Sequence, residues 1–133
     1  MERTKRNVLL VGGEAEGDRL SRLAKSLPAE RIRIAQSLPL TELAGLLARC
    51  DHFVGHDSGI SHLAAALGLL GHLLWAETST AVWAPRAEGM RLLQSPQGLH
   101  NLAPDAVASA ILESLSAEAK ANMFTRGRKD AKR

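Results

Sequence analysis

The segment from Phe53 to Leu67 constrains the fold of this chain more than any other part of it. A short apolar run ends at Val54, a polar turn occupies 55–59, and a stretch rich in Ala and Leu begins at once. This order predicts a strand, a loop and a helix. In an open α/β sheet such a loop lies at the carboxyl end of a strand, where ligands bind, and it leads into the positive end of a helix dipole. The segment therefore predicts an anion-binding turn.

Four residues of this segment carry chemistry that suits a sugar phosphate. Ser58 can cap the helix and donate to a phosphate oxygen, and Gly59 lets a ligand approach the backbone closely. Asp57 is an acceptor for sugar hydroxyls, and His62 follows one turn into the helix. The spacing alone is equally consistent with a simpler structural role, in which Asp57 and Ser58 only cap the helix and His62 packs at its start.

The rest of the chain alternates apolar runs with amphipathic segments. Strands are predicted at 7–11, 31–35, 51–54, 69–76 and 90–94, and helices at 14–27, 41–49, from 59 onward, and 105–115. This alternation predicts an α/β fold, a Rossmann-like parallel sheet with helices on both faces. Trp83, which follows the fourth strand, is expected to plug the end of the sheet.

Size and composition predict one domain and a tail. A chain of 133 residues with 45% hydrophobic content can bury one core, which we assign to 1–116, and the basic segment 117–133 is expected to be flexible. The single cysteine, Cys50, excludes an intrachain disulfide and favours a reducing compartment. No signal-peptide pattern and no run of membrane-spanning length is present, so a cytoplasmic location is expected.

The formal net charge of +3 is modest, and the basic residues gather at the two ends of the chain. A specific nucleic-acid partner is therefore not expected. The basic tail has three interpretations: a solvated end, a peripheral contact with the anionic inner membrane surface, or loose binding to nucleic acid. The histidines show no metal-ligand spacing, so neither a metal nor a cofactor is predicted.

The sequence of 57–68, Asp-Ser-Gly-x-Ser-His-Leu-Ala-Ala-Ala-Leu-Gly, closely resembles the signature of glycosyltransferase family 9, the ADP-heptose:lipopolysaccharide heptosyltransferases and their relatives. The resemblance continues upstream through 38–51 and downstream through 81–85, and it covers about 7–115 of the chain. It implies a GT-B architecture, in which two Rossmann-like domains face each other, and this chain corresponds to the C-terminal, donor-binding half.

The resemblance also implies a donor site for a nucleotide-diphosphate sugar of the ADP-heptose type. The signature residues Asp57, Ser58, Gly59 and His62 would hold the sugar and the diphosphate. Gly13 and Glu14 match a loop whose acidic residue bonds the donor ribose, and Leu38 matches a residue that lies against adenine. The residues themselves are equally consistent with two simpler roles: Glu14 complements a helix dipole, and Leu38 only packs in the core.

The loop after the fourth strand departs from the family pattern. Family members usually have Gly-Pro-Thr-Asp-Pro there, whereas this chain has Ala-Glu-Thr-Ser-Thr at 76–80. Thr78 keeps the hydroxyl of the pattern, and the Gly-Pro turn is lost. Thr78 is therefore included among the substrate-binding candidates.

The family mechanism is an inverting transfer in which a carboxylate base deprotonates the acceptor. That base belongs to the acceptor domain, which this chain lacks, so no catalytic residue is predicted. The expected function is a heptosyltransferase-like donor domain for a lipopolysaccharide-type acceptor, needing an acceptor-domain chain or self-association. The alternatives are a non-catalytic or degenerate nucleotide-sugar binding module and a nucleic-acid binder that uses its basic tail.

Overall fold

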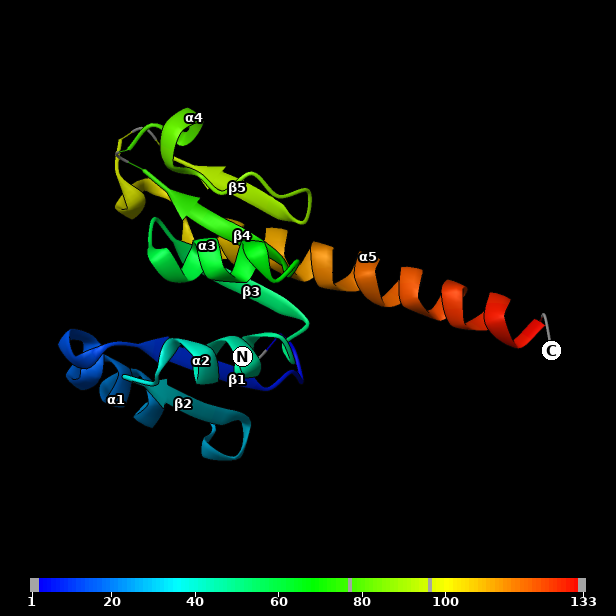
Figure 1. The fold of residues 1–133 in the computed structure, drawn as a ribbon, viewed down its shortest axis with the longest axis horizontal. Coiled ribbons are helices and arrows are strands. Elements are labelled where there is room, and N and C mark those ends of the chain that lie inside the picture. Colours follow the sequence, from blue (N-terminus) through cyan, green and yellow to red (C-terminus); the bar gives the residue numbers. More distant parts are fainter. Residues whose placement is uncertain (1–2, 77, 96, 132–133) are drawn as a thin grey trace. The chain divides into compact units, whose positions relative to one another are not determined.

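The computed structural model describes residues 3–76, 78–95 and 97–131. The chain divides into two compact units, Met1–Leu47 and Ala48–Arg133, each of which is described by itself. Figure 1 labels their helices and strands. Both units are built from parallel strands and helices, so the predicted α/β class is confirmed.

The first unit is a two-stranded parallel sheet with its connecting helices. Its elements are β1 (Val8–Gly12), a 3-10 turn (Glu14–Glu16), α1 (Gly17–Lys25), a second 3-10 turn (Ala29–Arg31), β2 (Ile32–Gln36) and α2 (Leu40–Leu47). Helix α1 packs on both strands, as a right-handed βαβ crossover does. Its buried residue Leu20 faces the sheet, where Ile32 and Ala35 are also buried.

The second unit is a three-stranded parallel sheet in the order β3-β4-β5 (Figure 1). Its elements are β3 (His52–His56), α3 (Gly59–Ala66), β4 (Leu70–Trp75), α4 (Thr80–Trp83), β5 (Met90–Gln94), a 3-10 turn (Leu99–Asn101) and α5 (Pro104–Ala131). Each of the predicted strands overlaps an observed one. Apolar runs predicted most of them, because buried parallel strands are apolar on both faces, whereas the strand at 31–35 was predicted from alternating charged and apolar residues.

Helices cover both faces of this three-stranded sheet. Successive residues of a strand point to opposite faces. On one face, a Cβ atom added to Gly55 would lie 2.9 Å from the Ser61 hydroxyl of α3. On the other face, the Ser114 hydroxyl of α5 lies 3.4 Å from Nε2 of His72. The prediction of helices on both faces therefore holds for this unit.

Helix α5 is longer than the sequence predicted. We expected it to end at Leu115, and it continues to Ala131. The sequence after Leu115 contains neither Gly nor Pro until Gly127 and has Ala at 117, 119 and 121, a residue that favours helices. The predicted flexibility of 117–133 stays a prediction.

The two tryptophans differ in burial, and only the expectation for Trp83 was wrong. Trp83 was expected to plug the end of the sheet, but it lies in the short helix α4 and is 57% exposed. Trp75, the last residue of β4, is fully buried and is the largest side chain of the core. The expectation for Trp83 was wrong because the sequence gives no sign of α4, which turns this side chain outward.

A pair of buried histidines lies between the sheet and α5. His52 Nε2 and His72 Nδ1 are 3.0 Å apart, and His72 is only 2% exposed. Glu118 Oε1 of α5 lies 3.3 Å from His52 Nδ1, at ion-pair distance but without the alignment of a hydrogen bond. Arg91 stands directly beside His72 on β5. Because one proton must lie between the two facing ring nitrogens, both rings cannot be charged without breaking this contact.

Burial lowers the pKa of His72 below its usual 6.5, and the nearby His52 and Arg91 act in the same direction, whereas Glu118 opposes them. The unfolded chain therefore binds this proton more readily than the folded chain. The stabilisation is complete above the unfolded-state pKa and is lost as the pH falls through the lower folded-state pKa.

We expect the free energy of unfolding to decrease when the pH is lowered from about 7.5 to about 5.5. Urea unfolding of the wild type and of His72→Leu at several pH values measures this effect. The leucine variant should show a smaller pH slope because it has no imidazole to protonate at this position. Equal slopes in the two proteins would contradict the prediction.

Candidate functional site

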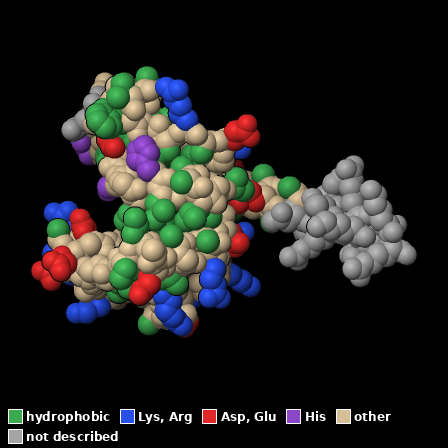
Figure 2. All heavy atoms as spheres, viewed as in Figure 1, with side chains coloured by type: hydrophobic (Ala, Val, Ile, Leu, Met, Phe, Trp, Pro, Cys, Tyr) green, Lys and Arg blue, Asp and Glu red, His purple; other side chains and the backbone are tan. Residues whose placement is uncertain are grey.

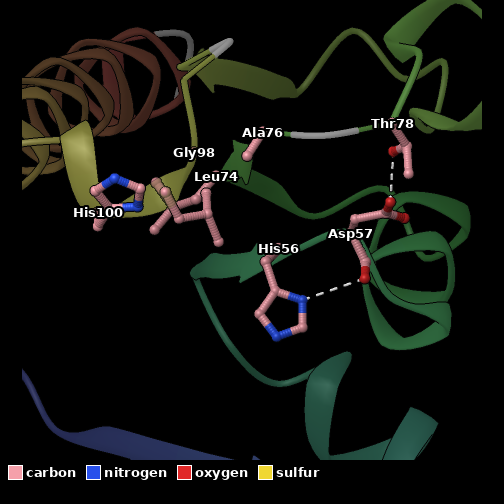
Figure 3. A pocket seen from close by; sticks show the side chains of 8 residues that line it. His56, Asp57, Leu74, Ala76, Thr78, Gly98 and His100 are labelled. Atoms are coloured by element: carbon pink, nitrogen blue, oxygen red, sulfur yellow. Dashed lines mark hydrogen bonds between the residues drawn. The ribbon is translucent and has the colours of Figure 1, made fainter.

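A pocket of about 450 Å³ lies at the carboxyl ends of β3 and β4, beside the connection from β5 to α5 (Figure 3). Its lining residues all belong to the second unit and are His56, Asp57, Leu74, Ala76, Thr78, Gly98, Leu99 and His100. The location agrees with the general rule that open α/β sheets bind ligands outside the carboxyl ends of their strands. Of the predicted site residues, the pocket contains Asp57 and Thr78.

Asp57 and Thr78 are joined by a hydrogen bond, although 21 residues separate them in the sequence. The Thr78 hydroxyl donates to Oδ2 of Asp57 at 2.5 Å. The backbone carbonyl of Thr78 in turn accepts from Nε1 of the buried Trp75 at 3.0 Å. The loop after β4 is thus fixed both to the core and to the loop after β3, even without the Gly-Pro turn of the family. Glu77 lies outside the described residues.

Ser61 holds the turn that precedes α3. Its side chain is fully buried, and its hydroxyl donates to the carbonyl of His56 at 2.5 Å. Ser58 has the extended backbone of an N-cap, with φ −159° and ψ 162°, but its side chain makes no capping bond. Its hydroxyl lies 3.4 Å from that of Ser61 instead. The sequence predicted the cap position correctly. It did not identify Ser61 as a residue that holds the turn, although its position three residues after Ser58 could have indicated this role.

Gly59 and His62 lie on the solvent side of α3. A Cβ atom added to Gly59 would meet no atom within 4 Å, so the space over the first turn of this helix is open. His62 is exposed and does not line the pocket. The structure therefore places His62 near the turn but not with Asp57 and Thr78.

The carboxyl ends of the two strands in the first unit are followed by Gly13, Glu14 and Leu38. The chain segments after β1 and β2 are held together by a hydrogen bond from the Ser37 amide to the Gly12 carbonyl, at 2.9 Å. The Gly13 amide donates to Oε2 of Glu16 at 2.9 Å, so Glu16 closes this turn. Glu14 is exposed, and Leu38 is partly buried. Their assigned contacts with ribose and adenine stay predictions.

Several other kinds of site find no support in the described residues. Within 3–76, 78–95 and 97–131, no group of three or more His, Cys, Asp or Glu side chains is placed to hold a metal ion. In the same part of the chain, no helix combines the length and the apolar character that crossing a bilayer requires. Cys50 is partly buried, and burial followed by the charge of Asp51 raises the pKa of its thiol, which disfavours a reactive thiolate.

The model of glycosyltransferase family 9 (heptosyltransferase) matches residues 1–102. The solved structure of ADP-heptose lps heptosyltransferase II from E. coli is 26% identical, with a TM-score of 0.72, over 84% of this chain and 35% of that protein. E. coli heptosyltransferase WaaC with ADP is 25% identical, with a TM-score of 0.72, over 80% of this chain and 33% of that protein. No curated protein sequence matches the chain.

A third structure, a family 9 glycosyl transferase from Veillonella parvula, is 19% identical with a TM-score of 0.61, over 67% of this chain and 26% of that protein, and supports the fold alone. The chain spans about a third of the length of the solved E. coli enzymes that it matches. The family model covers most of the chain, and the strand-loop-helix that carries Asp57 and Ser58 lies within the matched region. This chain therefore belongs to glycosyltransferase family 9, the heptosyltransferases.

Proposed function

We propose that this chain binds a nucleoside-diphosphate sugar of the ADP-heptose type as the donor-binding part of a glycosyltransferase. The observation that carries the proposal is the Asp57–Thr78 pair at the carboxyl ends of two parallel strands, next to the open first turn of α3. Family membership supports it. One E. coli relative is described with ADP, and the same enzyme is described with ADP-2-deoxy-2-fluoro heptose.

The diphosphate would lie over the first turn of α3, beside Ser58 and Gly59. The first N–H groups of a helix lack partners within the helix, and the helix dipole favours negative charge there. The Ser58 hydroxyl makes only a long contact of 3.4 Å, with Ser61, and can turn to donate to a phosphate oxygen. In a transfer reaction these groups would stabilise the leaving diphosphate as its charge develops.

We further propose that the sugar is passed to a lipopolysaccharide-type acceptor held by a separate acceptor domain or chain, in the cytoplasm. That domain would also supply the base that deprotonates the acceptor hydroxyl. Gly13, Glu14 and Leu38 are the proposed contacts of the first unit with the ribose and the adenine. A peripheral contact of the basic tail with the inner membrane would bring the site to lipid-linked acceptors.

A second candidate function is donor binding without transfer. The observation that favours it is the bonding of Asp57. Asp57 is the one carboxylate among the described residues that line the pocket, and its Oδ2 already accepts from Thr78. Such a carboxylate is placed to orient a ligand. Release of free sugar or transfer to an acceptor by the purified chain would rule out this second candidate.

Calorimetric titration with ADP, GDP, UDP and ADP-2-deoxy-2-fluoro heptose tests the proposed function. Selective binding of the ADP compounds is expected. Asp57→Ala should weaken binding of the sugar-bearing compound about ten- to a hundredfold, since a hydrogen bond to a charged group contributes about 1.5–3 kcal/mol. Glu14→Ala tests the proposed ribose contact in the same way.

Gly59→Ala is the sharper variant, because the added methyl group meets no protein atom and a helix tolerates alanine well. Any loss of affinity then reports the approach of the ligand to the backbone. Gly45→Ala is the matched control, since its methyl group also meets nothing within 4 Å and it lies in α2 of the other unit. A folded wild-type chain that binds none of the four compounds would refute the proposed function.

A further inference from the structure

We propose that His100 determines which sugar binds in the pocket beside Asp57, the residue to which the family resemblance assigns the sugar of the donor. This inference rests on the proposed function, because it assigns a part of the same ligand to this pocket. It follows from the charge of the lining, from the hydrogen bonds of His100 and from the backbone of Gly98.

The charge of the pocket disfavours an anion. Asp57 contributes a carboxylate, and no Lys or Arg is present among the described residues that line the pocket. A diphosphate would be repelled by this carboxylate and would find no cation to offset the repulsion. The apolar side chains of Leu74, Ala76 and Leu99 also line the pocket, and the remaining lining side chains are polar. A neutral group that combines hydroxyls with C–H faces, such as a sugar ring, fits this lining.

The neighbours of His100 determine which of its ring nitrogens carries the proton. The side-chain amide of Asn101 donates to the Gln97 carbonyl at 2.8 Å, and its nitrogen lies 3.2 Å from Nε2 of His100. A carbonyl can only accept, so the amide nitrogen must face Gln97, and its second hydrogen is directed to Nε2. Nε2 of the neutral ring is then the acceptor, and Nδ1 carries the hydrogen. His100 therefore brings an N–H donor to the pocket.

Gly98 allows the ring of His100 to take this position. Its φ is +105°, a backbone conformation that residues other than glycine rarely adopt, and Gly98 is buried. A Cβ atom at this position would lie 2.8 Å from Cε1 and 2.9 Å from Nδ1 of His100. The glycine thus lets the backbone pass close to the imidazole, and the ring is held by the turn before any ligand arrives. Preorganisation of this kind lowers the entropic cost of binding.

The side of the pocket formed by the loop after β3 offers acceptors. Nδ1 of His56 lies 3.3 Å from the Asp57 carbonyl, which can only accept, so Nε2 is the acceptor of the neutral His56 ring. The Asp57 carboxylate is a second acceptor. Figure 3 shows His100 on one side of Leu74, and Asp57 with Thr78 on the other. The N–H donor of His100 and the acceptors of His56 and Asp57 thus lie on different sides of an apolar wall. Such an arrangement can discriminate between sugars that differ in the position of one hydroxyl.

Calorimetry at about pH 8, where a free imidazole is neutral, tests the inference with two probes, ADP and ADP-2-deoxy-2-fluoro heptose. The measured quantity is the ratio of the two affinities. Wild type should bind the sugar-bearing compound more tightly than ADP. His100→Ala should reduce that ratio about three- to tenfold, as expected for one neutral hydrogen bond, and leave ADP affinity unchanged. His100→Gln, which keeps an N–H donor, should recover part of the ratio.

A second measurement does not depend on binding. The ¹⁵N chemical shifts of the His100 ring in the ligand-free wild type report its tautomer, and the Nδ1–H form is expected. The Nε2–H form, or an unchanged affinity ratio in His100→Ala, would overturn the inference alone. Failure of the wild type to bind either compound would overturn the proposed function, and the inference with it.

Discussion

Replacing Trp75 with alanine should lower the free energy of unfolding by about 3–5 kcal/mol, the usual cost of truncating a large aromatic side chain in a core. Trp75 is fully buried at the end of β4, and its indole N–H donates to the carbonyl of Thr78. The truncation would create a cavity in the second unit and release the loop that holds Thr78 against Asp57. Urea unfolding followed by circular dichroism measures the loss.

Two other variants make this expectation specific. Trp75→Phe keeps a buried six-membered ring and loses the pyrrole part of the indole together with its bond to Thr78, so it should cost less than the alanine variant. Trp83→Ala is the matched control in the same unit, because Trp83 is 57% exposed and surface truncations usually change stability by less than about 0.5 kcal/mol. Similar losses for Trp75→Ala and Trp83→Ala would show that the core has been wrongly identified.

Replacing Gly71 with alanine is expected to destabilise the chain by about 3 kcal/mol, at the upper end of the usual cost of overpacking. Gly71 lies in the central strand β4, and its amide donates to the Gly89 carbonyl at 2.9 Å. A Cβ atom there would overlap the backbone carbonyl of Phe53 on the paired strand β3 and lie 3.1 Å from Sδ of Met90. A backbone atom cannot turn away as a flexible side chain can. The two strands would have to separate.

Gly45→Ala serves as the control for this substitution. Its methyl group meets nothing within 4 Å, and Gly45 lies in the middle of α2, so the change should be neutral or should stabilise the helix by up to about 1 kcal/mol. The comparison separates the general effect of replacing a glycine from the specific overlap at β4. If Gly71→Ala unfolds at the same urea concentration as the wild type, the close approach of β3 and β4 at this residue is wrong.

On the one face that Figure 2 draws, the described charged side chains form no continuous basic surface. On the face that Figure 2 shows, Lys and Arg side chains lie in several separate places, with Asp and Glu side chains among them. Electrostatic binding of nucleic acid usually needs a continuous basic face.

The local pattern of the sequence was enough to predict the strands and the turn that bears the site. Apolar runs such as that of β1 and the Asp57-Ser58-Gly59 turn are local signals, because parallel strands are buried on both faces and helix starts need particular residues. The resemblance to the family rested on the same local segments, and the family model confirms it. The end of α5 was less well predicted, since a helix without Gly or Pro gives no clear stop signal.

Only the tertiary structure decided which side chains meet. The bond between Thr78 and Asp57, the contact of His52 with His72, and the position of His100 at the pocket all join segments that lie apart in the sequence. Periodicity specifies that a residue is on a strand or at its end, whereas the pairing of β3 with β4 specifies what stands beside it. The sequence by itself therefore determined the elements and the family of this protein. The sheet determined the pocket, because its lining comes from the ends of β3 and β4 and from the connection after β5, which only the parallel pairing brings together.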